Sequence, residues 1–253
     1  MKIGAQLYTV RDFTKTEEDV RSTFRKIAKM GYTCVQISAI WNVEPKKLRE
    51  IADENGLEIV ITHADKERIL NDTLAVIEEH KVMGCKHIGI GYNRFQADQI
   101  ESYSNFLREY DQAAKLIHKN GLKLHYHNHA FEFEKVGDIT GFEYFVKETD
   151  PALWGFILDT FWVQYGGKNP ADVITELEGR ITAIHYKDFT MKDDKQKMAE
   201  ILEGNLDWTK IVDATEKTKI EFVLIEQDGD WAVGPFESLE TSYNNLNRFL
   251  SKR

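Results

Sequence analysis

The chain has 253 residues, of which 42% are hydrophobic and 30% charged, and its net charge is −9. This composition is typical of a soluble globular protein, and the acidic balance argues against a nucleic-acid partner, which would need a basic face. No stretch approaches the ~20 apolar residues of a membrane span, and the opening MKIGAQLYTVRD lacks the apolar segment of a signal peptide. We therefore expect no membrane partner, a cytoplasmic location and two reduced cysteines.

Short β-branched runs alternate along the chain with longer amphipathic stretches. The expected strands are Ile3–Tyr8, Thr33–Ser38, Glu58–His63, His87–Gly91, Leu122–His127, Trp154–Asp159, Ile181–Tyr186 and Glu221–Glu226. The expected helices include Glu17–Met30, Pro45–Asn55, Glu67–Met83, Asp98–Asn120 and Phe236–Lys252. Eight strand-then-helix units predict an α/β fold, a (β/α)8 TIM barrel, as one domain over residues 1–253.

An open, doubly wound sheet is the competing architecture. Such a sheet often carries a Gly-rich phosphate loop after its first strand, and the turn LYTVRD has none. The barrel is therefore the favoured fold.

At the ends of the predicted strands, polar residues occupy the alternate positions whose side chains point in one direction. Side chains alternate along a strand, so one phase faces the helices and the other faces the barrel interior. The helix-facing phase is apolar. The interior phase ends in Gln6, Gln36, His63, Asn93, His127, Asp159, His185 and Glu226. Because active sites of these barrels lie at the carboxyl ends of the strands, we expect these side chains to share one mouth.

Three of these residues suggest a metal site. Asp159, His185 and Glu226 end three successive apolar runs, and a buried carboxylate needs a partner. A divalent cation would relieve the repulsion among convergent carboxylates. Glu132, just past the strand that ends at His127, is the first candidate for a fourth ligand, and Glu134 could replace it. Oxygen-rich ligation with one imidazole favours Mn²⁺, with Mg²⁺, Co²⁺ or Zn²⁺ as alternatives.

The remaining polar groups at this mouth suggest roles toward a substrate. His127 suits a general base or a substrate contact, whereas His125 is one layer deeper in the core. Lys187 could neutralise an oxyanion or a phosphate, or could be a solvated loop cation. Trp162 could form an apolar wall for a sugar ring, or could pack beneath its loop. Gln6, Gln36 and His63, across the mouth, would contact the sugar hydroxyls.

Five motifs carry a resemblance to a known family: QLYTVRD, YHNHAFEF, LDTFWV, HYKDF and IEQD. Over its whole length the chain resembles the xylose isomerase-like TIM barrels, specifically the group of sugar phosphate isomerases and epimerases. The resemblance implies one divalent cation held by Glu132, Asp159, His185 and Glu226. It also implies that His127 acts as an acid or base.

The chain departs from this family at two positions. Gln36 stands where many relatives carry a Glu, which removes one acid or sugar contact. Trp162 stands where many carry a His, which weakens the expectation of a ketose 3-epimerase mechanism. The single-metal set and the acidic charge do not match the His-rich, multi-zinc DNA-repair branch of the family.

These residues predict an enzyme with a small sugar as its substrate. The first expectation is a metal-dependent sugar, or sugar phosphate, isomerase or epimerase that removes a proton next to a carbonyl through an enediolate. Glu132 and Glu226 would transfer the proton, with His127 and Lys187 as further catalytic groups. One alternative is a lyase or hydrolase that acts on 3-keto-glycosides by elimination. Another is a non-catalytic sugar-binding barrel. A homo-oligomer is compatible with the sequence.

Overall fold

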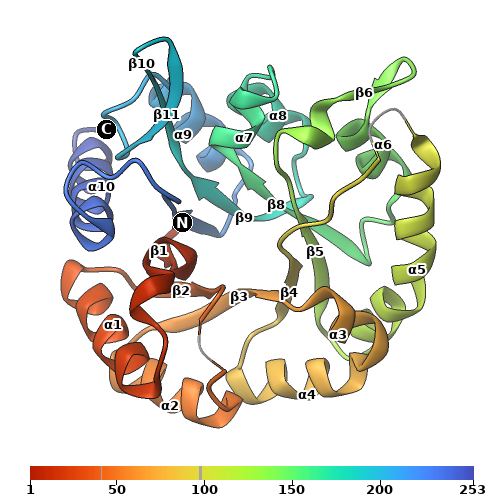
Figure 1. The fold of residues 1–253 in the computed structure, drawn as a ribbon, viewed down its shortest axis with the longest axis horizontal. Helices are drawn as coiled ribbons and strands as arrows, with labels where there is room; N and C mark the ends of the chain where they lie inside the picture. Colours follow the sequence, from red (N-terminus) through yellow and green to blue (C-terminus); the bar gives the residue numbers. More distant parts are fainter. Residues whose placement is uncertain (41, 97–98) are drawn as a thin grey trace.

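The computed structural model describes residues 1–40, 42–96 and 99–253. Within these ranges, eight parallel strands close into a barrel in the order β1-β12-β9-β8-β5-β4-β3-β2. Their bounds are β1 Lys2–Gln6, β2 Cys34–Ile37, β3 Glu58–Ala64, β4 His87–Ile90, β5 Lys123–His127, β8 Trp154–Asp159, β9 Ile181–Tyr186 and β12 Phe222–Ile225. Figure 1 looks into this barrel and shows the helices in a ring around it. The predicted (β/α)8 fold is confirmed.

The surrounding helices lie close to their predicted positions. They are α1 Glu17–Met30, α2 Pro45–Glu54, α3 Lys66–Asn71, α4 Thr73–Met83, α5 Ile100–Lys119, α6 Gly141–Glu148, α7 Thr160–Tyr165, α8 Pro170–Glu176, α9 Trp208–Lys217 and α10 Pro235–Leu250. The predicted helix Glu67–Met83 is broken at Asp72, whose backbone has φ −140° and ψ 40°. The expected start of another helix at Asp98 lies outside the described residues.

The first strand is shorter than expected because its end is capped by a side chain. Gln6 accepts a hydrogen bond from the backbone N–H of Tyr8 at 2.7 Å, and the chain turns into the 3₁₀ segment Leu7–Phe13. This turn places Gln6 and Tyr8 at the mouth of the barrel, next to the end of β12.

The core consists of two layers. The larger layer lies between strands and helices and includes the outward-facing residues Leu124, Tyr126 and Leu158. The smaller layer fills the barrel interior with Cys34, Val60, Ile61, Ile157, Ala183, Phe222 and Leu224. This division follows the strand alternation predicted from the sequence. Polar side chains occupy the interior beyond the smaller layer, toward the carboxyl ends of the strands.

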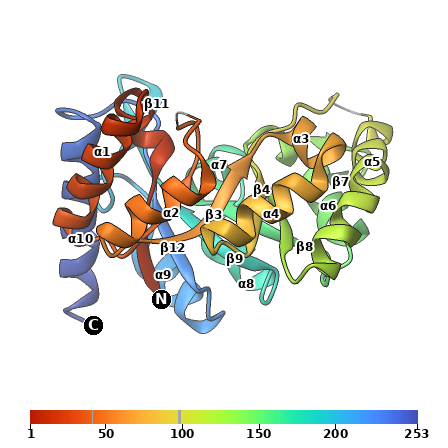
Figure 2. The ribbon, with the colours of Figure 1, turned by 90° about the horizontal axis from the view of Figure 1, so that it is seen from below.

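Two hairpins, β6 Lys135–Val136 with β7 Ile139–Thr140 and β10 Asp188–Lys192 with β11 Lys195–Ala199, interrupt the repeating pattern. In the side view of Figure 2, β11 lies at the top of the molecule and both termini lie at the bottom. Buried Asp188 accepts hydrogen bonds from the backbone N–H groups of Leu202 and Gly204, which ties β10 to the following loop. Among the described residues, no helix is long and apolar enough to cross a lipid bilayer.

Candidate metal centre and active site

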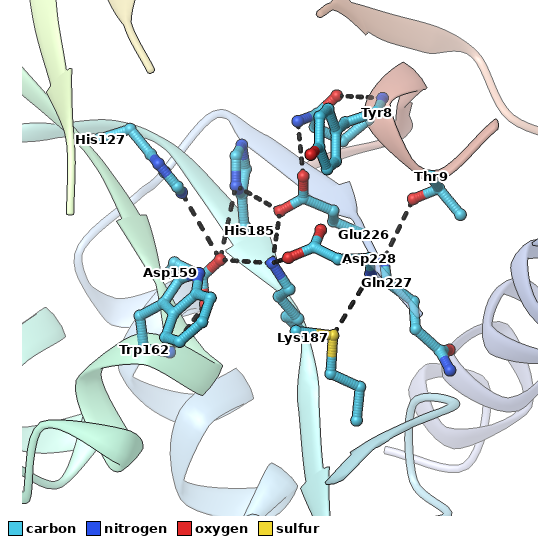
Figure 3. Close-up of polar contacts among 12 residues, drawn as sticks. Tyr8, Thr9, His127, Asp159, Trp162, His185, Lys187, Glu226, Gln227 and Asp228 are labelled. Carbon is cyan, nitrogen blue, oxygen red and sulfur yellow. Dashed lines mark hydrogen bonds and ion pairs between the residues drawn. The ribbon is translucent and has the colours of Figure 1, made fainter. Parts of the chain in front are cut away.

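Four buried side chains from four adjacent strands converge at the barrel mouth. His127 ends β5, Asp159 ends β8, His185 lies on β9 and Glu226 follows β12. Each offers one nitrogen or oxygen, and these four atoms lie within 4.8 Å of one another. Figure 3 shows the four side chains pointing toward a common point. We call these four residues the metal-binding group.

Both imidazoles are oriented by an oxygen on their outer side. Nδ1 of His127 lies 3.1 Å from the carbonyl oxygen of Gly91, and Nε2 of His185 lies 2.7 Å from Oε1 of Gln36. Each outer nitrogen therefore donates a hydrogen bond, and the other ring nitrogen faces the carboxylates. Histidines that bind metals are typically oriented in this way by a second partner.

The two carboxylates are also held in place by their neighbours. Asp159 caps helix α7, because its Oδ1 accepts a hydrogen bond from the backbone N–H of Trp162 at 3.0 Å. Gln6 donates from Nε2 to Oε1 of Glu226 at 2.6 Å. In both residues, one oxygen is used for positioning and the other faces the centre of the group.

A buried ammonium group lies beside the carboxylates. Nζ of Lys187 is 2.6 Å from Asp228, 3.1 Å from Glu226 and 3.4 Å from Asp159. It also lies 5.3 Å from the ring centroid of Trp162. Lys187 therefore partly neutralises the three carboxylates, and Figure 3 shows it between Asp159 and Asp228.

The electrostatic environment changes the protonation of these groups. Burial raises the pKa of Asp159 and Glu226, but Lys187 and the neighbouring histidines together outweigh it and hold both pKa values below their usual range. Burial lowers the pKa of His185, but Glu226 and Asp159 raise it to about 9. A metal ion would displace this proton, so metal binding would release protons.

The metal-binding group fits a divalent cation. Nε2 of His127, Oδ2 of Asp159 and Nδ1 of His185 are buried and make no well-aligned hydrogen bond among the described residues, although Nδ1 of His185 lies 3.0 Å from Glu226 and Oδ2 of Asp159 lies 3.4 Å from Nζ of Lys187. Buried polar atoms without partners are costly and call for an explanation. Three such atoms aimed at one point, with a Glu226 oxygen beside them, form the donor set that a bound cation would satisfy.

The structure does not bring Glu132 into this group, and His127 takes the fourth position instead. The carboxylate of Glu132 is fully buried, with one oxygen 2.5 Å from the Tyr126 hydroxyl and the other 2.7 Å from the backbone N–H of His129. Tyr126 faces the helices, so the Glu132 carboxylate that contacts its hydroxyl lies outside the barrel interior. Burial raises the pKa of Glu132 to about 8. Glu134, the other candidate, is exposed.

A cavity of 510 Å³ opens above the metal-binding group. Of the residues predicted to contact substrate, Gln6, His63 and Trp162 line it. Gln36 is fully buried against His185 instead, so its position is that of a support for a ligand.

The sequence did not predict a site role for several of the residues that line the cavity. They include Tyr8, Ser38, Lys66, Tyr92, His129 and Asp228. Most of them lie in loops beyond the strand ends, where strand alternation gives no information. Asp228 could have been predicted from the sequence, because it is the last residue of the motif IEQD and lies two residues after Glu226.

Fold and site together define a TIM barrel with a candidate metal centre at the carboxyl ends of its strands. The family model described as xylose isomerase-like TIM barrel matches residues 24–248, and the chain belongs to this family. The resemblance predicted from the sequence motifs is confirmed.

Individual relatives are more distant. The inosose dehydratase of Geobacillus kaustophilus is 24% identical over 199 residues, which cover 68% of this chain and 62% of that protein. The chain thus spans less than two thirds of that relative's length. A sugar phosphate isomerase/epimerase from Parabacteroides distasonis superimposes with a TM-score of 0.81 at 20% identity over 98% of both chains. The zinc-bound IolI protein gives a TM-score of 0.74 at 13% identity over 100% of this chain and 99% of that one. These two likenesses show the fold.

Proposed function

We propose that the protein is a metal-dependent sugar isomerase or epimerase that removes a proton from the carbon next to a carbonyl. The observation that carries this proposal is the metal-binding group beside a polar cavity of 510 Å³. A cavity of this size accommodates a small sugar.

His127, Asp159, His185 and Glu226 would hold the cation. When bound, a divalent ion would polarise the substrate carbonyl and stabilise the negative charge that develops as the proton leaves. The group contains two imidazoles and two carboxylates, whereas the sequence predicted a ligand set with one imidazole. The second imidazole makes Mg²⁺ a poorer fit and leaves Mn²⁺ as the first choice, with Co²⁺ and Zn²⁺ next.

Candidate residues for proton transfer line the cavity. His63 lies near the end of β3, His129 just after β5, Lys187 just after β9 and Asp228 after β12. Burial, together with His127, lowers the pKa of His129 to about 3, so this imidazole is unprotonated at neutral pH and offers a lone pair to the substrate, but it is only a weak base.

Lys187 has the complementary property. Burial lowers the pKa of its ammonium, but Asp159, Glu226 and Asp228 raise it above the usual value, so the group stays protonated. A charged donor at the cavity wall can stabilise a substrate oxygen that gains negative charge. An unprotonated imidazole and a charged donor in one cavity are the kinds of group that proton abstraction next to a carbonyl uses.

Elimination is the second candidate. The same proton abstraction, followed by departure of a neighbouring hydroxyl as water, or of the glycosidic oxygen of a 3-keto-glycoside as an alcohol, would make the protein a lyase; in each case the leaving oxygen takes up a proton. The match to a relative named inosose dehydratase favours this outcome, and Lys187 could stabilise the departing oxygen.

Proton exchange in D₂O separates these functions. The metal-free protein, resupplied with Mn²⁺, Co²⁺, Zn²⁺ or Mg²⁺, is incubated with keto and aldo sugars and a keto-inositol, and deuterium incorporation is followed by NMR. An isomerase or epimerase would give deuterated saturated products, and a lyase would give an unsaturated ketone. Binding of these sugars without exchange under any metal would contradict both and favour a non-catalytic barrel.

A variant of Lys187 tests the catalytic assignment. Lys187→Met should lower turnover ~10²–10⁴-fold, as loss of a positioned acid–base group typically does, while the metal content stays at the wild-type level. Lys46→Met, which removes an exposed cation on α2, is the matched control. Full activity of Lys187→Met would show that its ammonium only balances charge.

A further inference from the structure

Two lysines line the cavity, and their surroundings differ. Lys187 lies within 3.4 Å of three carboxylates, so its charge is balanced by the protein itself. Lys66 follows β3 on the opposite side of the barrel mouth. Among the described residues, no carboxylate lies within salt-bridge distance of the Lys66 ammonium.

Lys66 is nevertheless held in place. Its backbone carbonyl accepts a hydrogen bond from the Tyr110 hydroxyl at 3.1 Å, and its Nζ donates to Oδ1 of Asn93 at 2.9 Å. Asn93 is an amide and carries no charge to balance the ammonium. An ammonium has three donors, so two of them remain beyond the one that Asn93 accepts. The half-buried ammonium is thus fixed by neutral partners and keeps donors for a ligand.

The wall around Lys66 has room for a substituent. Ala39 and Ala64 contribute small side chains, and Ser38 and Tyr92 contribute hydroxyl groups. Ala39 has a positive φ of 51°, which is uncommon outside glycine and marks a tightly constrained turn at the edge of the cavity. No acidic side chain lines this wall in the described part of the chain, whereas Glu226 and Asp228 line the opposite one.

We infer that the cavity takes a sugar with an anionic substituent, a phosphate ester or a carboxylate, bound at Lys66 with the reacting carbonyl at the metal-binding group. This inference rests on the proposed function, since it places the reacting end of the substrate at that group. A carboxylate or phosphate gains a charge-assisted hydrogen bond from the ammonium, and a neutral sugar does not. The two ends of the cavity would therefore fix the direction in which the substrate binds.

The first test compares three substrates that share one carbon skeleton: a neutral keto sugar, its terminal phosphate ester and its terminal carboxylic acid. The ratio of kcat/KM for each anionic form to that for the neutral form is measured by deuterium exchange. We expect this ratio to exceed ~10 in the wild type for at least one anion, and to fall ~10–100-fold in Lys66→Met, because hydrogen bonds to charged groups are worth about 1.5–3 kcal/mol. Which anion is preferred distinguishes phosphate from carboxylate. Lys46→Met should leave the ratio unchanged.

A ratio near one in the wild type, or one that Lys66→Met does not alter, would overturn the inference while leaving the proposed function intact. A second test does not depend on turnover. Inorganic phosphate and acetate are titrated into the wild type, Lys66→Met and Lys46→Met, each loaded with diamagnetic Zn²⁺, at constant ionic strength, and binding is followed by NMR shifts of Tyr92 and Ala64. Weaker anion binding in Lys66→Met alone supports the anion subsite even if no sugar is turned over. Equal binding by all three proteins contradicts it.

Discussion

Nε2 of His127 lies 3.5 Å from Oδ2 of Asp159, and neither buried atom has a hydrogen-bond partner among the described residues. The outer nitrogen of His127 already donates to the Gly91 carbonyl, so Nε2 presents a lone pair to the carboxylate. A lone pair facing a carboxylate is repulsive unless a proton or a cation lies between them. This relationship makes His127 a candidate metal ligand, where the sequence predicted a general base or a substrate contact.

His127→Ala should therefore reduce metal binding as well as activity. His129→Ala is the control, because His129 lies in the same cavity but outside the metal-binding group. We expect elemental analysis after dialysis to show metal in the wild type and in His129→Ala, and a strong loss in His127→Ala. Full metal occupancy in His127→Ala would restore the acid–base role predicted from the sequence.

Gln36 should control metal affinity through His185. Its Oε1 lies 2.7 Å from Nε2 of His185, and such outer partners typically contribute 10–100-fold to metal affinity. Gln36→Leu removes the acceptor and should weaken Mn²⁺ binding by about that factor in a competition titration. Gln36→Glu keeps an acceptor at this position and should retain affinity. Equal weakening in both variants would mean that Gln36 supports only the local packing.

The sequence predicted the convergence of three of these side chains for a simple geometric reason. Asp159, His185 and Glu226 end successive apolar strands, and strand alternation directs all three side chains into the barrel. The same reasoning directs the His127 side chain into the barrel, because His127 occupies an inward-facing position at the end of β5. The fourth ligand was assigned by resemblance to Glu132, in a loop where alternation gives no direction. The signal for His127 was therefore present in the sequence but was interpreted as a catalytic one.

Strand and helix periodicity could not predict several other features of the structure. The contact of Lys187 with Asp228 joins two residues 41 positions apart through loop geometry. The break at Asp72 depends on local backbone angles within a continuous amphipathic pattern. The β10–β11 hairpin adds strands that do not belong to the barrel.

Glu132 should affect stability and its pH dependence while leaving the metal in place. The folded protein raises the pKa of Glu132 from 4.5 to about 8, chiefly through burial. Because this pKa is raised on folding, the contribution of Glu132 to stability is fully present below about pH 4.5 and is lost as the pH rises toward 8. The loss is at most about 1.4 kcal/mol per pH unit.

Glu132→Gln should remove this part of the pH dependence, because an amide does not titrate in this range. The free energy of unfolding, measured with urea at several pH values, should fall less steeply with pH in Glu132→Gln than in the wild type. Glu134→Gln, at an exposed position, is the control and should follow the wild type. If the slopes of all three proteins coincide, burial does not govern the titration of Glu132.

The most direct test of the metal-binding group is anomalous diffraction from crystals soaked in Mn²⁺. We expect one strong peak within a coordination distance of about 2.0–2.5 Å of His127 Nε2, Asp159 Oδ2, His185 Nδ1 and a carboxylate oxygen of Glu226. A peak beside Glu132, or no peak at the barrel mouth in crystals that bind Mn²⁺ elsewhere, would contradict the account.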